Sequence, residues 1–194
     1  MIRPLTLLLT FVLTALLAVT ARAEPVTYSF DPGHTYIGIN WNHLGFSTQR
    51  ARFGEFSGTL VLDEEDPANS SVSISIRIDS LDTGIAKLDE ELVGPEFFDA
   101  ESYPVAEFES DRIEVVGDGM ALVHGSLTLK GQSHPLTLEV VLNQIGENPI
   151  NNRRTAGFEA EGVVDRTIYG IDKYAPAVSA DIGLTIAAEA AVAE

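Results

Sequence analysis

Strict alternation of apolar and polar residues constrains this chain more than any other feature. Residues 71–79 place Val72, Ile74 and Ile76 on one face, and Ser or charged residues on the other. A period of two residues is typical of a β-strand with one buried and one solvated face. Residues 136–142 repeat the pattern with Leu and Val. The sequence therefore predicts a sheet that covers an apolar interior.

Less regular strand signals cover most of the remaining chain. They fall at residues 26–30, 34–44, 53–62, 105–116, 121–130, 154–166 and 177–187. Gly, Pro, Asn and Asp separate them, as in hairpin connections. About eight long, successive strands favour an all-β fold, an antiparallel up-and-down barrel, with a sandwich as the alternative. Residues 188–194 carry no core signal, and we expect this tail to fray.

Residues 82–103 interrupt the alternation with a helical insert. Ile85, Leu88 and Leu92 recur at helical spacing. Asp82 suits the N-cap of this helix, and Gly94 suits its end. A helix this short is marginal alone, so its apolar side must dock on another element.

The residues after this helix extend the same apolar side. Pro95 suits the first position of a second, single-turn helix that ends near Asp99. We expect Leu88, Leu92, Phe97 and Phe98 to face inward over one open end of the barrel. The insert is therefore predicted to be a lid.

Residues 1–23 have the pattern of a secretory signal peptide. Arg3 precedes an apolar run, and Ala21-Arg22-Ala23 supplies a small-x-small cleavage pattern. The run is shorter than the ~20 residues that span a bilayer, which disfavours a membrane anchor. Residues 24–194 then form one exported domain, without stable membrane insertion.

Charge and cysteine content exclude several classes of function. The formal charge is −17, and loss of both leader arginines makes the mature chain more acidic still. Such a surface repels nucleic acid and anionic membrane faces. The chain has no Cys, so thiolate metal sites, cysteine nucleophiles and disulfides are absent.

No catalytic or metal-binding motif stands out. His34, His43, His124 and His134 lack metal-ligand spacing, and we expect no metal site. Carboxylates are too numerous here for a pair of them to indicate acid–base catalysis. An enzyme acting on a prenyl or acyl lipid, with His43 and a nearby carboxylate as acid and base, remains an alternative hypothesis.

The inward faces of the strands together favour a hydrophobic ligand. Aliphatic and aromatic side chains dominate every predicted inward face, and a hydrocarbon chain gains about 0.8 kcal/mol for each buried CH₂. The same side chains are also compatible with a filled barrel that binds nothing, such as a structural or stress-related protein. Periodicity alone leaves both readings open.

Several segments, in order, resemble one family. They are residues 34–46, 52–60, 82–84, 97–99, 103–104, 108–110, 125–131 and 156–160. Together they are similar to the YceI-like polyisoprenoid-binding proteins. This resemblance implies an extended, lipocalin-like barrel in the bacterial periplasm that holds a long isoprenoid-type lipid and has no established catalytic residues.

The resemblance and the strand pattern together define a predicted ligand site and its partners. The partner is a hydrophobic small molecule such as a polyprenyl or quinone-like lipid, no other cofactor is expected, and the oligomeric state, including a homodimer, stays open. The predicted ligand-binding residues are Ile39, Trp41, His43, Phe56, Leu60, Ile74, Ile76, Leu88, Leu92, Phe97, Phe98, Phe108, Leu138 and Val140.

One departure from the family pattern lies in the insert. Members of the family often carry Arg-Asp-x-His-Leu followed by a basic residue, whereas residues 88–93 read Leu-Asp-Glu-Glu-Leu-Val. Positions that are basic or titratable in relatives are here apolar or acidic. The tail site is unaffected, but recognition of a pyrophosphate head is disfavoured.

Overall fold

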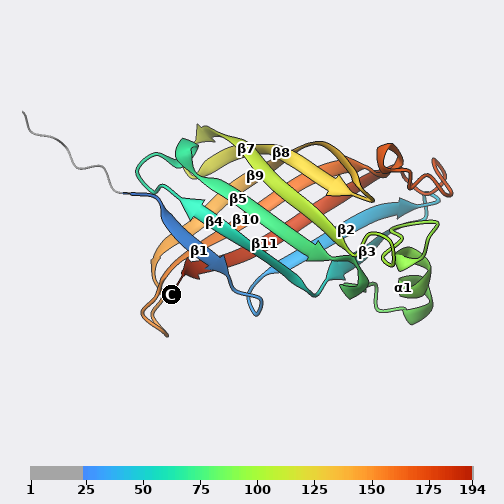
Figure 1. Cartoon of the computed structure of the whole chain (residues 1–194), viewed down its shortest axis with the longest axis horizontal. Coiled ribbons are helices and arrows are strands. Elements are labelled where there is room, and N and C mark those ends of the chain that lie inside the picture. Colours follow the sequence, from blue (N-terminus) through green and yellow to red (C-terminus); the bar gives the residue numbers. More distant parts are fainter. Residues whose placement is uncertain (1–23, 194) are drawn as a thin grey trace, which may run out of the picture.

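The computed structural model describes residues 24–193, so the predicted signal peptide lies outside the described residues. These residues form a single antiparallel sheet, one α-helix and three short 3-10 helices (Figure 1). The strands are β1 (Val26–Phe30), β2 (Tyr36–His43), β3 (Ser47–Phe53), β4 (Phe56–Leu62), β5 (Ser71–Arg77), β6 (Leu81–Asp82), β7 (Val105–Gly117), β8 (Met120–Leu129), β9 (Gln132–Glu147), β10 (Arg154–Asp165) and β11 (Asp181–Val192). The helices are η1 (Pro67–Asn69), η2 (Ile78–Ser80), α1 (Ala86–Val93) and η3 (Arg166–Tyr169).

The sheet closes into the predicted eight-stranded barrel because short strands share three of its positions. Both β1 and β2 pair with β11. Their partners in the next position are β4 and β3, which in turn pair with β5 and β6. Single strands β7 to β11 complete the circle. The prediction of an antiparallel barrel is confirmed, and the alternative of a sandwich is not.

The breaks between these short strands explain two wrong strand limits. Residues 47–53 form β3, which the alternation did not reveal, because its small and polar residues follow no clear period. The predicted strand at 53–62 is therefore divided at Gly54, between β3 and β4. The predicted break between β1 and β2 is confirmed: the chain turns after β1, where the Asp31 carboxylate accepts a hydrogen bond from the Gly33 N–H.

One end of the barrel is closed by a small cluster of side chains. Tyr28 and Ala190 are fully buried there, beside Leu60 and Leu62 of β4. The prediction that the tail frays is wrong: β11 extends to Val192, and its last residues pair with β1. The prediction failed because the tail is rich in alanine, which carries little hydrophobic signal in the sequence. In the structure these small side chains fit beside the bulky Tyr28.

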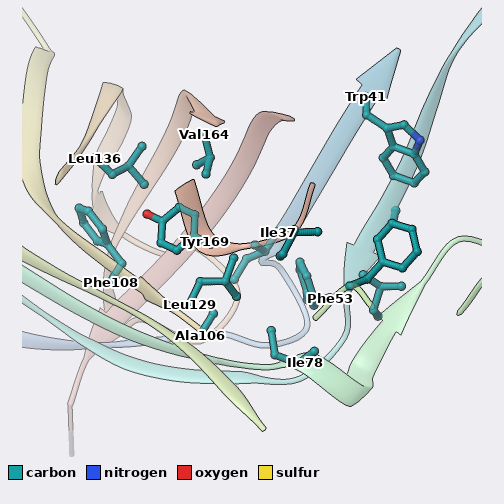
Figure 2. Packing of buried hydrophobic residues seen from close by; sticks show 14 of the residues in the cluster. Ile37, Trp41, Phe53, Ile78, Ala106, Phe108, Leu129, Leu136, Val164 and Tyr169 are labelled. Atoms are coloured by element: carbon teal, nitrogen blue, oxygen red, sulfur yellow. The ribbon is translucent and has the colours of Figure 1, made fainter. Parts of the chain in front are cut away.

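The main core fills the rest of the interior. Side chains of Ile37, Phe53, Ile78, Leu129 and Tyr169 converge from different elements (Figure 2). The inward faces predicted from alternation are confirmed for β2, β7 and β9, which contribute to this core Ile37 and Trp41, Ala106 and Phe108, and Leu136 and Leu138.

The helical insert lies at the end of the barrel opposite to the C-terminus (Figure 1). Leu88 and Leu92 pack against the core, as predicted, but Ile85 is 57% exposed and is the N-cap of α1. Asp82 belongs to β6 and pairs with Arg52, so its predicted capping role is wrong. Residues 95–98 form turns rather than a second helix.

Candidate functional site

An apolar cavity of about 130 Å³ lies inside the barrel, at the end covered by the insert. Trp41, Ile39 and Phe53 contribute to its wall from β2 and β3, and Ala106 from β7. Leu92 of α1 closes it from the lid side. The remaining lining residues are Ile76, Ile78, Phe97, Phe98, Leu127, Leu129, Val164, Arg166, Ile171, Val178 and Ile182.

The lid is held by aromatic contacts and by local hydrogen bonds. Phe98 packs edge-on against Phe53, with ring centroids 6.1 Å apart. The Asp89 carboxylate accepts hydrogen bonds from the N–H and the hydroxyl of Thr83, at 2.7 and 2.6 Å. These bonds tie α1 to the chain that enters it, while its apolar side rests on the barrel.

Arg166 is the exception in this apolar lining. It is 6% exposed, and its guanidinium donates hydrogen bonds to four backbone carbonyls. The acceptors belong to Ile171, Lys173, Val178 and Ser179, at 2.5 to 3.0 Å. Burial lowers the pKa of Arg166, although the nearby carboxylates of Asp172 and Asp165 oppose this shift. The guanidinium therefore holds together the segment that connects η3 to β11.

Lys173 is a basic group beside the lid, and two glutamates pair with it. It forms ion pairs with Glu96 and with Glu91, the latter at 3.7 Å. The hydrogen bond that its ammonium donates to the Glu96 carboxylate raises the pKa of Lys173. Its ammonium also lies 5.5 Å from the ring centroid of Phe97.

A larger hollow, of about 360 Å³, lies over β9, β10 and β11. Its lining includes the exposed residues Gln144, Glu147 and Glu159. Such a polar, acidic surface does not match a hydrocarbon ligand, so the smaller internal cavity is the better candidate.

Comparison with known proteins identifies the family of this barrel. The sequence model of the YceI-like domain matches residues 28–190. Protein YceI of Salmonella arizonae is 34% identical over 184 residues, which cover 94% of this chain and 95% of that protein. The chain belongs to the YceI-like family.

Solved structures show the same fold at lower identity. BcnA of Burkholderia cenocepacia matches the YceI-like chain with a TM-score of 0.75 and 22% identity, over 82% of this chain and 98% of that one. The Campylobacter jejuni YceI protein matches with a TM-score of 0.72 and 24% identity, over 79% and 90%. A polyisoprenoid-binding domain from Saccharophagus degradans matches with a TM-score of 0.64 and 14% identity, over 87% and 99%.

The YceI-like barrel brings most of the predicted site residues together. Six line the cavity: Ile39, Trp41, Ile76, Leu92, Phe97 and Phe98. Six more pack in the same core without lining the cavity: Phe56, Ile74, Leu88, Phe108, Leu138 and Val140. Ligand contact by any of them stays a prediction.

Two predicted residues lie elsewhere in the YceI-like barrel. Leu60 belongs to the cluster at the closed end. His43 is exposed where β2 ends, and it is absent from the cavity lining. Alternation placed His43 on the inward face, but the strand has passed the rim of the barrel there.

Sequence reasoning missed the cavity residues that follow no long alternation. Arg166, Ile171 and Val178 come from the irregular connection before β11. Ala106 of β7 and Ile78 of η2 also line the cavity and were not predicted, the first because its side chain is small and the second because it follows the end of β5.

Within residues 24–193, no three His, Asp or Glu side chains are arranged to hold a metal ion. The helices in that range are all too short or too polar to cross a membrane. Among the same residues, no carboxylate forms an ion pair or hydrogen bond with His43.

Proposed function

We propose that this YceI-like protein is a periplasmic carrier of an isoprenoid-type lipid whose head group is uncharged. The observation that carries the proposal is the internal cavity, whose walls are aliphatic and aromatic and whose cover is a separate helical insert. The structural likeness to a polyisoprenoid-binding domain from Saccharophagus degradans supports this ligand class. The leader pattern at residues 1–23 supports export.

The size of the cavity indicates how a long tail is accommodated. At about 130 Å³, it is smaller than the roughly 300–1,000 Å³ of small-molecule sites. A polyprenyl tail must therefore extend into space that core side chains fill. Partly buried side chains such as Ile74, Phe56 and Val140 pack against the buried core, and a long tail would have to displace some of them. The lid, which rests on the barrel through few side chains, supplies the entrance.

Charge around the cavity favours an uncharged head group. Arg166 donates four of its five N–H groups to backbone carbonyls, and Lys173 is paired with Glu91 and Glu96. A pyrophosphate would have to displace these partners. A quinone or prenol head has no such requirement.

Extraction of the protein purified from its periplasm tests the proposal directly. Denaturation followed by mass spectrometry of the organic extract is expected to release a prenyl lipid. Trp41 is the only tryptophan of the chain and lines the cavity, so its fluorescence reports uptake of added ligand. A quinone with a prenyl tail should quench it in a saturable manner.

His43→Ala is the control that separates a carrier from an enzyme. Its side chain lies outside the cavity lining, so uptake and the recovered lipid should be unchanged. Conversion of bound lipid that disappears in this variant would favour the enzyme hypothesis. An interior free of lipid, together with no uptake of prenyl chains, would reject the carrier.

A further inference from the structure

The turn between β2 and β3 carries two apolar side chains into solvent. Phe46 is 88% exposed and Leu44 is 49% exposed. Leu44 has φ 57° and Gly45 has φ 79°, the backbone of a type I′ hairpin turn. Asn-Gly is the preferred pair in such a turn, and leucine adopts the left-handed region only with strain. Neither folding nor solubility explains a leucine followed closely by an exposed phenylalanine here.

A neighbouring loop presents a third exposed ring. Tyr174 is 56% exposed and also has a positive φ, 64°. The two loops are joined: the Leu44 N–H donates to the Ala177 carbonyl at 3.1 Å, and His43 forms a bridge with Val178. We call Leu44, Phe46 and Tyr174 the apolar rim. A β-bridge fixes these loops relative to each other, so the rim is part of the barrel end.

The apolar rim is continuous with the candidate cavity. The Tyr174 ring lies 6.3 Å from the ring of Phe97, which lines the cavity. Val178, which bridges to His43, is also a lining residue. Tyr174 and Val178 therefore connect the loop that carries part of the rim to the wall of the cavity beneath the lid, with the Lys173 ammonium 5.0 Å from the Tyr174 ring centroid.

The charge distribution indicates what the rim contacts. Residues 32–54 contain no Asp or Glu, although the chain has 29 acidic residues, and they include Arg50 and Arg52. Glu90 and Glu91 of α1 nevertheless lie at the same end of the barrel (Figure 1). The hairpin can approach a lipid surface without repulsion, but the acidic helix beside it opposes an anionic one. A zwitterionic bilayer fits both features.

We propose that the apolar rim inserts into the headgroup region of a zwitterionic bilayer and places the barrel mouth against the membrane. Aromatic and aliphatic side chains at a loop tip are suited to this interfacial depth. The docking itself is independent of the proposed function; only the transfer of a lipid from bilayer to cavity rests on it.

Flotation of the mature protein with phosphatidylcholine vesicles tests the docking. The double variant Leu44→Asn/Phe46→Ser should lose vesicle binding by about tenfold or more, because it removes the two apolar side chains that the bilayer would bury. Asn suits the turn better than Leu, so the melting temperature should be equal or higher. Loss of binding therefore cannot be explained by unfolding.

Ile150→Ser is the matched control. Ile150 is 92% exposed, but it lies between β9 and β10, at the opposite end of the barrel. Vesicle binding by this variant should equal that of the wild type. Addition of phosphatidylglycerol to the vesicles should weaken binding at low salt.

Several results would overturn the proposal. They are no binding by the wild type, equal binding by the double variant, and stronger binding to anionic vesicles. A concentration-dependent dimer that the double variant abolishes, without vesicle binding, would assign the rim to a second copy of the chain. If the protein binds vesicles but a prenyl quinone does not quench Trp41, the docking stands and the carrier function is rejected instead.

Discussion

The ring of Phe108 lies over Gly125, the residue diagonal to it across β7 and β8. A Cβ atom on Gly125 would be 2.7 Å from Cζ of Phe108 and 2.2 Å from the backbone oxygen of Glu109. Both distances are well inside van der Waals contact, and the second involves backbone that cannot move alone. Glycine at this position therefore lets a large ring cross the barrel interior while β7 and β8 stay paired.

Gly125→Ala should consequently be strongly destabilising. We expect a loss of about 2 kcal/mol or more in the free energy of unfolding, measured by urea denaturation. Gly146→Ala on β9 is the control, because nothing lies within 4 Å of its added Cβ. That variant should change stability by less than ~1 kcal/mol. Equal losses of stability in the two variants would mean that the packing of the Phe108 ring does not require a glycine at position 125.

Alternation predicted the barrel because a strand with one buried face shows a period of two apolar and polar residues in the sequence itself. The isoleucines of β5 and the leucines of β9 face the interior as expected. The tail of β11 was missed because alanine is apolar but small, and its burial depends on the neighbour. Ala190 is fully buried in the same cluster as Tyr28.

The candidate site could be predicted only in part for a similar reason. Side chains from regular strands and from the helix, such as Trp41 and Leu92, line the cavity as expected. Arg166, in contrast, is buried by an irregular loop whose carbonyls surround it. No periodicity signals such a residue, because its partners are backbone atoms of any sequence.

Arg166→Met tests the role of this buried guanidinium. The change keeps much of the side-chain volume but leaves four backbone carbonyls without their donor, so we expect a loss of about 3 kcal/mol or more. Hydrogen exchange should accelerate at residues 171–179. Arg112→Met is the control: it removes only an exposed ion pair with Glu114, and the loss should stay below ~1 kcal/mol. Protection of residues 171–179 that survives Arg166→Met would disprove the organising role.

Glu64 makes the stability of the closed end of the barrel dependent on pH. It accepts hydrogen bonds from Tyr28, at 2.9 Å, and from Arg154. The bond with Arg154 lowers the pKa of Glu64 below its ordinary value of 4.5. Its contribution to stability is therefore complete above pH 4.5 and is lost as the pH falls through the lower, folded-state value.

Glu64→Gln should reduce the slope of stability against pH in that acidic range. Thermal melts between neutral pH and pH 3 measure this slope. Glu114→Gln is the comparison: Arg112 also lowers the pKa of Glu114, but solvent screens that exposed pair, so its effect on the slope should be smaller. An identical slope in wild type and Glu64→Gln would show that other carboxylates account for acid unfolding.

Ala106→Leu should block ligand uptake without preventing folding. Ala106 is 7% exposed and lines the cavity, so the larger side chain occupies space that the ligand would use. Overpacking of this kind costs about 1–3 kcal/mol, which a barrel with a free cavity tolerates best. Quenching of Trp41 by a prenyl quinone measures uptake.

The control for that experiment makes the same change on the outer face. Ala187 of β11 is absent from the cavity lining, and Ala187→Leu should leave quenching unchanged. If Ala106→Leu were quenched at the same ligand concentration as the wild type, the ligand would occupy a different site.

The head group of the ligand is the last property that the structure constrains. Two basic groups near the cavity are already engaged, Lys173 by Glu91 and Glu96, and Arg166 by carbonyls. On the lid helix itself, Asp89, Glu90 and Glu91 outnumber Lys87. At ~8 Å and an effective dielectric near 20, each pair of like unit charges costs roughly 2 kcal/mol before screening. A pyrophosphate head would meet this repulsion, and a quinone or prenol would not.

Paired titrations at low and physiological salt, followed through Trp41, compare these heads on tails of equal length. We expect the quinone or prenol to bind at least as tightly as the pyrophosphate, with little salt dependence. The affinity for the pyrophosphate should rise with salt, because screening relieves repulsion. Glu91→Gln supplies a further check, since it frees Lys173 from one partner and should favour the pyrophosphate selectively. A clear preference for the pyrophosphate that weakens with salt would instead mean that Lys173 or Arg166 exchanges its partners for the ligand.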